Sequence, residues 1–296
     1  MIRNPFEKEE EQYIQLIKDI LKEGNYDTGR NGNNISIFGS SMIFSLKNNK
    51  IPLLTSKKLA WKTCLKELLW FIRGETDNAT LQSQNVHIWD KNATRNFLDE
   101  RKLTHYEEGD LGPVYGHQWR HFNAEYTNCK TDYSGKGIDQ LQMVIDQLQD
   151  INTRKSRRII LTSWNPKQLD EMALPPCHIL AQFHVSNENE LSCSMYQRSA
   201  DVGLGVPFNI ASYSFLTHLL AKHCDLKPDK LIYMAGNCHI YDDHVEPLKE
   251  QINKVLFDFP TIEIINKHEN INHYQIHDFR INNYICNEKI NMEVRA

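Results

Sequence analysis

Three short runs of strand-forming residues follow one another in the middle of the chain, and they constrain its fold more than any other feature. They span 158–164, 179–185 and 191–196, and an apolar segment with the length of a buried helix follows at 208–223. Strands and helices therefore mix without strict alternation, which favours an α+β fold. Since there is no internal repeat and no low-complexity linker, we expect a single domain over 1–296.

Apolar periodicity and turn residues predict the other elements of the chain. A helix should begin at Asn4-Pro5 and end at Gly24, because Asn caps a helix and Pro suits its first turn. Gly39 should form a turn between two strands. The remaining predictions are a loop at 25–34, strands at 35–38 and 42–46, a buried helix at 59–72, a loop at 109–116, an amphipathic helix at 138–148 and a strand at 231–234.

Charge and composition exclude several classes of protein. The formal net charge of −4 provides no basic field that would recruit long nucleic acid. No stretch approaches the roughly 20 apolar residues that a membrane helix needs, and the acidic N-terminal stretch does not resemble a secretory signal. The seven cysteines are scattered without C-x-x-C pairs, which argues against a zinc site and favours free thiols in the cytoplasm. Because the sequence begins at Met1, we expect no reductase domain fused to it.

Cys177 is the first candidate for chemistry. It follows two prolines and precedes a predicted strand, so the thiol should lie on a rigid rim outside any hydrogen-bonded ladder. A thiolate needs nearby positive charge, and Arg198, just past the end of the next predicted strand, could supply it across a hairpin. A half-buried structural cysteine is the alternative.

Several arginines could form a phosphate site. Arg157 and Arg158 open a predicted strand, Arg198 ends one, and Arg30 lies in a loop rich in Gly and Asn. Guanidinium groups bind phosphate through paired hydrogen bonds, so these residues would form a phosphomonoester site if they converged. Surface salt bridges are the alternative for each of them.

Two polar residues stand in apolar surroundings. Asn209 lies where the apolar helix begins, and its amide could pair with the O4 and N3–H edge of uracil; a helix cap is the alternative. Glu67 lies in the predicted helix 59–72, where it must be paired, hydrated or shifted in pKa, unless it lies on a solvated face with Lys66.

A short polar segment near residue 240 could contact a ligand. His239 and Tyr241 alternate along an extended segment and could point at one ligand. A metal site at His239 and His244 is disfavoured, because their spacing is five residues and not the four of a helical pair.

Seven segments, spread over nearly the whole chain, are similar in sequence and order to one enzyme family. They are 52–58, 67–74, 108–116, 173–178, 196–201, 204–213 and 239–241. On these segments the chain resembles the thymidylate synthases. The resemblance implies a mixed β-sheet with helices on one face and the sheet of a second copy on the other, in a homodimer. It also implies a methyltransferase of dTMP biosynthesis that uses dUMP and 5,10-methylenetetrahydrofolate and needs no metal, membrane or nucleic acid.

The resemblance also implies roles for individual residues. Cys177 would add to C6 of dUMP, Glu67 would organise proton transfer and Asn209 would read the base. The other residues that it makes catalytic are Tyr115, His178, Arg198 and Asp201. Those implied at dUMP are Arg30, Arg198, Ser199, Asp201, Asn209, His239 and Tyr241, together with Arg157 and Arg158 of the partner subunit. Those implied at the folate are Lys57, Trp89, Asn92, Asp201, Leu204, Gly205, Phe208 and Ala296.

The chain departs from the family pattern in four places. The loop that follows Arg30 is one residue shorter than the usual Arg-Thr-Gly-Thr-Gly-Thr, Asn237 replaces a common Asp, and Lys58 replaces a common Arg. The C-terminal residues 292–296 read Met-Glu-Val-Arg-Ala, where the family ends in Met-Ala-Val.

Three other functions compete with the synthase. A deoxypyrimidylate hydroxymethylase on the same fold would tend to carry Asp at the position of Asn209 if it acted on dCMP. A catalytically inactive RNA-binding or scaffold relative should have lost the nucleophile early, yet Cys177, Arg198 and Asn209 are all present. A papain-like cysteine hydrolase would need a motif around the cysteine that this chain lacks.

Overall fold

A computed structural model describes residues 8–29 and 32–295, so Asn4, Pro5, Arg30 and Ala296 lie outside the described residues. The helices are α1 (Glu11–Glu23), α2 (Trp61–Ile72), α3 (Asn78–Gln82), α4 (Asp90–Ala93), α5 (Arg95–Glu100), α6 (Tyr115–His121), α7 (Gln140–Gln149), α8 (Gly205–His223) and α9 (Val245–Gln251). The strands are β1 (Asn25–Gly29), β2 (Gly32–Ser45), β3 (Ile160–Thr162), β4 (His178–Val185), β5 (Glu190–Asp201), β6 (Lys227–Tyr241), β7 (Thr261–Ile264) and β8 (Phe279–Asn282).

Six of these strands form one mixed sheet in the order β1-β2-β6-β5-β4-β3. Neighbouring strands are antiparallel except for β5 and β6, which are parallel because α8 connects them and returns the chain to the same edge. A separate antiparallel pair is formed by β7 and β8. The predicted α+β class and the mixed sheet are confirmed.

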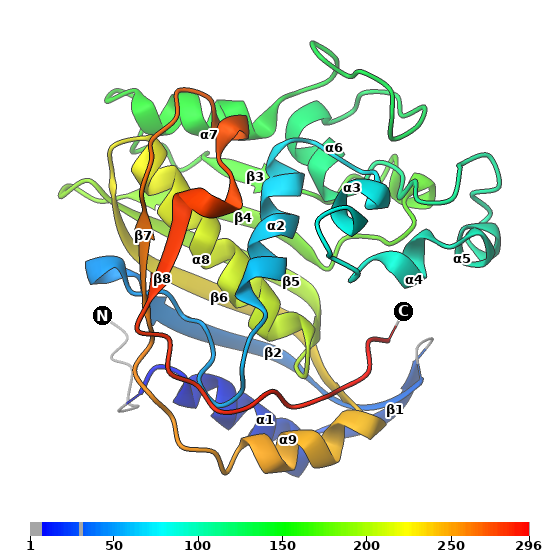
Figure 1. The fold of residues 1–296 in the computed structure, drawn as a ribbon, viewed down its shortest axis with the longest axis vertical. Coiled ribbons are helices and arrows are strands. Elements are labelled where there is room, and N and C mark those ends of the chain that lie inside the picture. Colours follow the sequence, from blue (N-terminus) through cyan, green and yellow to red (C-terminus); the bar gives the residue numbers. More distant parts are fainter. Residues whose placement is uncertain (1–7, 30–31, 296) are drawn as a thin grey trace.

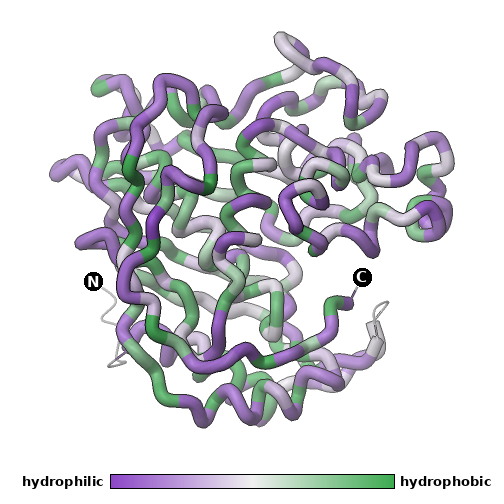
Figure 2. The backbone as a smooth tube through the Cα atoms, in the orientation of Figure 1, coloured by the Kyte–Doolittle hydropathy of each residue, from purple (hydrophilic) through white to green (hydrophobic). Residues whose placement is uncertain are grey.

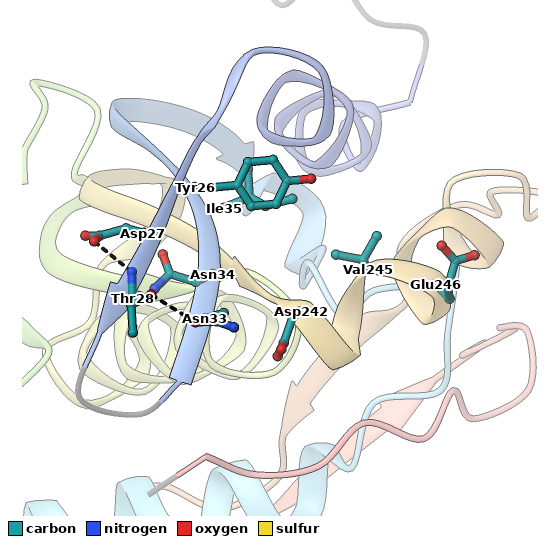
Figure 3. A pocket seen from close by; sticks show the side chains of 9 residues that line it. All are labelled: Tyr26, Asp27, Thr28, Asn33, Asn34, Ile35, Asp242, Val245 and Glu246. Atoms are coloured by element: carbon teal, nitrogen blue, oxygen red, sulfur yellow. Dashed lines mark hydrogen bonds between the residues drawn. The ribbon is translucent and has the colours of Figure 1, made fainter.

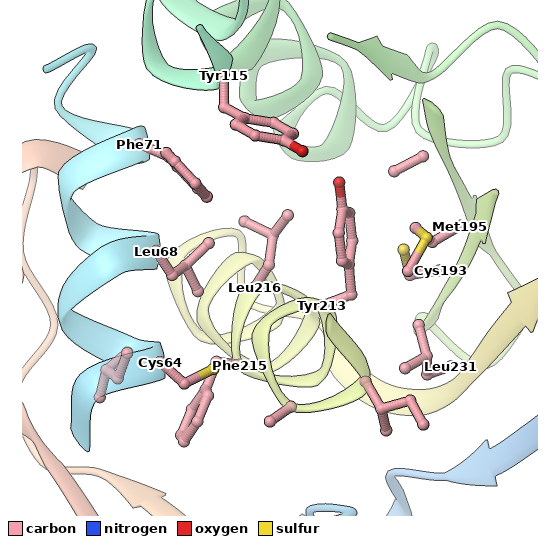
Figure 4. Packing of buried hydrophobic residues seen from close by; sticks show 14 of the residues in the cluster. Cys64, Leu68, Phe71, Tyr115, Cys193, Met195, Tyr213, Phe215, Leu216 and Leu231 are labelled. Carbon is pink, nitrogen blue, oxygen red and sulfur yellow. The ribbon is translucent and has the colours of Figure 1, made fainter. Parts of the chain in front are cut away.

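Helix α8 covers one face of the sheet because nearly its whole surface is apolar. Tyr213, Phe215 and Leu216 are among its buried residues. Helix α8 packs against β5 and β6 and also against α2 (Figures 1 and 4). Full burial of side chains of this size contributes about 1.5–3 kcal/mol each. In Figure 2 the hydrophobic colour gathers in these central elements and the hydrophilic colour in the peripheral loops.

The side chains on the opposite face of the sheet are only partly buried by the described residues in the central strands. The strand registers place Thr162, Leu180, Tyr196 and Met234 side by side in a row across β3, β4, β5 and β6. Met234 is 43% exposed although it lies in the middle of a sheet. An apolar row of this kind on a sheet face indicates an interaction surface.

The alternation of buried side chains changes phase at one level in three neighbouring strands. In β6 the buried apolar residues have odd numbers up to Ala235 and even numbers from Cys238 onward. The same change occurs in β5 near 198–199 and in β2 at Gly39, whose φ of 91° is rarely adopted by other residues. The ends of these strands therefore turn a different set of side chains toward the helices.

Gly236 allows the two central strands to approach each other at this level. A Cβ atom there would lie 2.7 Å from the hydroxyl oxygen of Tyr196 and 2.9 Å from the carbonyl oxygen of Arg198. Any larger residue would push β6 away from Arg198, so the glycine fixes the position of a candidate site residue.

The structure corrects several predicted boundaries. The predicted loop at 25–34 instead contributes to β1 and to the start of β2. The Asn and Gly residues here pair in an antiparallel hairpin at the edge of the sheet. Gly39 forms no turn, and β2 continues through it. The strand predicted at 231–234 is the centre of a strand that runs from 227 to 241, and the predicted loop at 109–116 ends in the first residues of α6. The predicted helices at 59–72 and 138–148 are confirmed within two residues.

Candidate active site

Cys177 lies at the corner that precedes β4, directly after two prolines. Because β4 and β5 are antiparallel neighbours, this corner lies opposite Arg198, whose main-chain N–H donates to the carbonyl oxygen of Cys177 at 2.8 Å. The predicted placement of the two residues across a hairpin is confirmed. The prediction that Arg198 follows the end of a strand is wrong, because β5 continues to Asp201 through polar residues that do not resemble a strand in sequence.

The guanidinium group of Arg198 folds back over the same corner. Its Nε donates to the carbonyl oxygen of Pro176 at 2.8 Å, and Nη2 donates to that of Pro175 at 3.0 Å. It also lies over the ring of Trp164, at 5.4 Å from the centroid. A positive charge is thereby fixed beside the peptide that carries the Cys177 thiol.

A cavity of about 300 Å³ opens in front of this corner. Its lining unites residues that are far apart in the sequence and come from α2, α6, α8, β4, β5, β6 and the C-terminal segment. The lining residues are Glu67, Trp89, Tyr115, Leu174, Cys177, His178, Gln197, Arg198, Ser199, Asp201, Gly205, Asn209, His239, Tyr241 and Arg295.

Glu67 points from α2 into the cavity and is not on a solvated face. Trp89 donates its indole N–H to Oε1 of Glu67 at 2.7 Å. Burial raises the pKa of the Glu67 carboxyl to about 7, although the bond from Trp89 lowers it. The group can therefore exchange a proton near neutral pH.

Tyr115 and His178 form the wall next to the thiol. The main-chain N–H of Cys177 donates to the hydroxyl of Tyr115 at 2.8 Å, and the two rings stack with centroids 4.1 Å apart. Burial lowers the pKa of His178 to about 3, so its ring is neutral at pH 7. Its Nδ1 pairs with the hydroxyl of Tyr213 at 2.9 Å, and Figure 4 shows that hydroxyl pointing toward that of Tyr115.

Asn209 is the fifth residue of α8 and lines the cavity. The cap position of this helix belongs to Leu204, so the alternative that Asn209 is a helix cap is wrong. A Cβ atom at Gly205 would lie 3.7 Å from Oδ1 of Asn209, in ordinary van der Waals contact, so the start of α8 lies directly beside this amide.

His239 and Tyr241 lie two residues apart on β6, and both line the cavity as predicted. With Ser199 they also line an adjoining cavity of about 250 Å³ next to the start of β2. The His239 ring donates to Oδ1 of Asn237 at 2.9 Å, so the residue that replaces a common Asp still accepts this hydrogen bond.

Asp201 ends β5 and organises the loop before α8. Its Oδ1 accepts hydrogen bonds from the main-chain N–H groups of Gly203 at 2.9 Å and Leu204 at 3.3 Å. Lys57 donates to the carbonyl oxygen of Gly203 at 2.5 Å, and burial lowers its pKa to about 8. Lys57 therefore supports this loop from outside the cavity lining.

Some predicted residues are not brought to the cavity. Arg157 and Arg158 are exposed in the turn before β3 and pair with no described carboxylate. The lining also lacks the predicted folate contacts Lys57, Asn92, Leu204 and Phe208. The predictions for Arg30 and Ala296 lie outside the described residues.

Sequence reasoning missed Leu174, Gln197 and Tyr213. Leu174 and Gln197 line the cavity, and Gln197 accepts a hydrogen bond from the hydroxyl of Tyr233 at 2.9 Å. All three lie inside segments that resemble the family, within four positions of Cys177, Arg198 or Asn209. Their positions in the motifs were therefore the available signal.

A larger cavity of about 700 Å³ lies between the β1–β2 hairpin and the start of α9 (Figure 3). Its lining includes Tyr26, Asp27, Asp242 and Glu246 but none of the candidate catalytic residues. Among residues 8–29 and 32–295, no group of three or more His, Cys, Asp or Glu side chains could hold a metal ion. None of the helices in this part of the chain has the length and apolar character needed to cross a membrane.

Comparisons with known proteins agree with this geometry. A family model described as thymidylate synthase matches residues 11–296. The bifunctional dihydrofolate reductase-thymidylate synthases of Plasmodium chabaudi and Zea mays are 51% and 50% identical over 288 and 287 residues, which is 97% of this chain and 49% and 54% of those proteins. The protein of the same name from Leishmania major is 46% identical over 292 residues, 98% of this chain and 56% of its own length.

The chain thus spans about half the length of the curated relatives that it matches. The match of the family model nevertheless covers almost all of its residues. This chain belongs to the thymidylate synthase family.

Proposed function

We propose that the chain is a thymidylate synthase that converts dUMP and 5,10-methylenetetrahydrofolate into dTMP and dihydrofolate. One observation carries the proposal: a single cavity collects the thiol of Cys177, the carboxyl of Glu67 and the amide of Asn209. Its volume of about 300 Å³ suits small-molecule ligands. Trp89 and Leu174 add the apolar wall that a flat bicyclic ring would need.

In this proposal the sulfur of Cys177 adds to C6 of the uracil ring. C5 thereby becomes an enolate carbon and can bond to the one-carbon unit. C5 then loses its proton, the bond between the one-carbon unit and the folate nitrogen breaks, and transfer of a hydride from the folate forms the methyl group as the sulfur leaves. The nucleotide is reductively methylated, and the folate is oxidised to dihydrofolate. Arg198 supports the thiolate from the adjoining turn.

The nucleotide would be recognised mainly from β5, β6 and α8. Asn209 can donate to O4 and accept from N3–H of uracil. Arg198 and Ser199 would bind the phosphate together with Arg30, and with Arg157 and Arg158 of the partner subunit. His239 and Tyr241 would contact the ribose hydroxyl, because both project from the end of β6 into the cavity.

Proton transfer would centre on Glu67, whose pKa near 7 allows it to gain and lose a proton during turnover. Tyr115 offers a hydroxyl beside Cys177, and the neutral ring of His178 holds that wall in place. Asp201, Trp89 and Gly205 would meet the folate directly. Lys57, through Gly203, would shape the loop from behind.

Two features support a homodimer with sheets back to back. The row of Thr162, Leu180, Tyr196 and Met234 leaves apolar side chains uncovered on the sheet face, and Arg157 and Arg158 extend from the same edge of the sheet. A second copy packed on this face would bury the row and remove the apolar side chain of Met234 from water. We therefore expect a dimer by light scattering and a monomer for Met234→Glu; a wild-type monomer would contradict the proposed subunit arrangement.

The chain forms one contiguous hydrophobic core, which supports a single domain over 1–296. The described cysteines form no recorded disulfide, which supports a reducing, cytoplasmic location.

One assay tests the proposed reaction. The protein is incubated with dUMP and methylenetetrahydrofolate, and the absorbance of dihydrofolate is followed while the nucleotide is identified by chromatography. We expect dTMP and dihydrofolate in equal amounts. Formation of 5-hydroxymethyl-dUMP without dihydrofolate would show a hydroxymethylase instead and would overturn the proposal.

A further inference from the structure

The last described residues run between α4 and the β1–β2 hairpin (Figure 1), and Arg295 lines the cavity. Lys91 of α4 donates to the carbonyl oxygen of Val294 at 2.8 Å, and His244 donates through Nε2 to that of Glu293 at 2.8 Å. Both are contacts with the main chain of the tail, so they do not depend on which side chains residues 293 and 294 carry.

Arg295 adds contacts that depend on its own side chain. Its Nη2 lies 2.8 Å from Oδ1 of Asp243 and 3.3 Å from Oδ1 of Asp242. Its guanidinium group also lies over the ring of Tyr241, at 5.8 Å from the centroid. Arg295 and Tyr241 both line the cavity, so this ion-pair cluster joins the tail to the end of β6 at the site itself.

The surroundings of the cluster favour a charged pair. Burial disfavours the Asp243 carboxylate, but hydrogen bonding from Arg295 and the charges of His244 and Arg295 lower the pKa of Asp243 overall. Other ionisable groups nearby are Asp201, 3.7 Å from His244, and Glu293 on the tail. The Arg295 side chain is 33% exposed, so salt should weaken the pair without abolishing it.

We propose that Arg295 is a positioning residue whose ion pairs with Asp243 and Asp242 fix the C-terminal segment against Tyr241 and so retain ligands in the cavity. Arg295 takes no part in bond making, because its Nη2 pairs with two carboxylates at the rim and a guanidinium group does not give up a proton in proteins. This role rests on the proposed synthase function, but the anchoring itself does not.

Charge reversal separates this role from direct contact with a ligand anion. Arg295→Glu should repel Asp243 and release the tail, and Asp243→Arg should release it in the same way. In the double variant the pair forms again with opposite signs, so the anchoring should return. A ligand anion that depended on Arg295 would not be rescued by an arginine at position 243 paired with a glutamate at 295.

Two measurements decide between these outcomes. Hydrogen exchange of the C-terminal peptide, without ligand, should be about fivefold faster in Arg295→Glu and within about twofold of wild type in Arg295→Lys and in the double variant. In the dihydrofolate absorbance assay, KM for methylenetetrahydrofolate should rise about fivefold in Arg295→Glu, while kcat changes by less than about twofold. Arg280→Glu, which breaks an exposed pair with Glu263 on the β7–β8 hairpin, is the matched control and should alter neither quantity.

Unchanged exchange in Arg295→Glu, or no recovery in the double variant, would overturn the proposal. A fall in kcat at constant KM would overturn it as well, because it would place Arg295 in the chemistry. If the wild-type protein forms no dTMP, the proposed function fails, and the exchange data still decide whether Arg295 anchors the tail.

Discussion

The two sides of the cavity are built in different ways. On the thiol side, one main-chain hydrogen bond joins Arg198 of β5 to Cys177 just before β4, and the Arg198 side chain donates to carbonyl groups of the same turn. On the tail side, Arg295 of the C-terminal segment lies over the ring of Tyr241, the last residue of β6. An ion pair between Arg295 and Asp243 fixes this contact. The thiol is therefore placed by the main chain of the sheet, whereas the proposed retention of ligands depends on side-chain contacts of the C-terminal segment.

The largest effect should come from the thiol side. Cys177→Ser replaces the thiol with a hydroxyl, which is a much weaker nucleophile, so turnover should fall by at least about 10³-fold. Steady-state assays measure the loss, and light scattering shows that the oligomer persists. Wild-type turnover in this variant would remove Cys177 from the mechanism.

A smaller loss should follow from Glu67→Gln, by about 10²-fold in kcat, since the amide cannot exchange a proton. The break near pH 7 in the wild-type rate profile should then disappear. Trp89→Phe removes a hydrogen bond that favours the carboxylate, so the break should move to higher pH. A profile that keeps its break in Glu67→Gln would assign that pKa to another group.

The same raised pKa affects stability in a defined direction. Folded protein binds a proton at Glu67 that the unfolded chain releases above its ordinary pKa of 4.5. Stability from this group is therefore present below about pH 4.5 and is lost as the pH rises through about 7. In denaturant titrations, the free energy of unfolding of the wild type should fall relative to that of Glu67→Gln as the pH rises from about 4.5 to about 7. A difference between the two proteins that stays constant from pH 4 to 8 would argue against the shift.

Base selection should depend on α8. In Asn209→Asp the preference should shift from dUMP toward dCMP by about tenfold or more, because a carboxylate accepts from the cytosine amino group. The ratio of kcat/KM for the two nucleotides measures the change. Unchanged preference for dUMP would show that Asn209 does not read the base.

The smallest effect is expected on the tail side. Tyr241→Phe removes one hydroxyl from the rim, and loss of a single hydrogen bond to the ribose should raise KM for dUMP by about threefold to tenfold with little change in kcat. A loss of kcat as large as that of Glu67→Gln would contradict the division of roles between the two sides.

The thiol side was also the more predictable from sequence. The two prolines and the hairpin placed Cys177 opposite Arg198 without any knowledge of the fold. The tail side depends on β6, whose end at 239–241 was predicted as extended, and on β2, whose first residues were predicted as loop because Asn and Gly there are ordered only by pairing with neighbouring strands. The contacts of Arg295 join residues about fifty positions apart, and local patterns contain no information on them.

The most direct test of the central claim is to trap the bond between Cys177 and the nucleotide. With fluorine in place of hydrogen at C5 of dUMP, the proton that must leave is absent, so the adduct should accumulate in the presence of methylenetetrahydrofolate. Mass spectrometry of the digested protein should then show the nucleotide and the folate on the peptide that contains Cys177, and no adduct in Cys177→Ser. An adduct on another cysteine, or none in a protein that produces dTMP, would contradict the account.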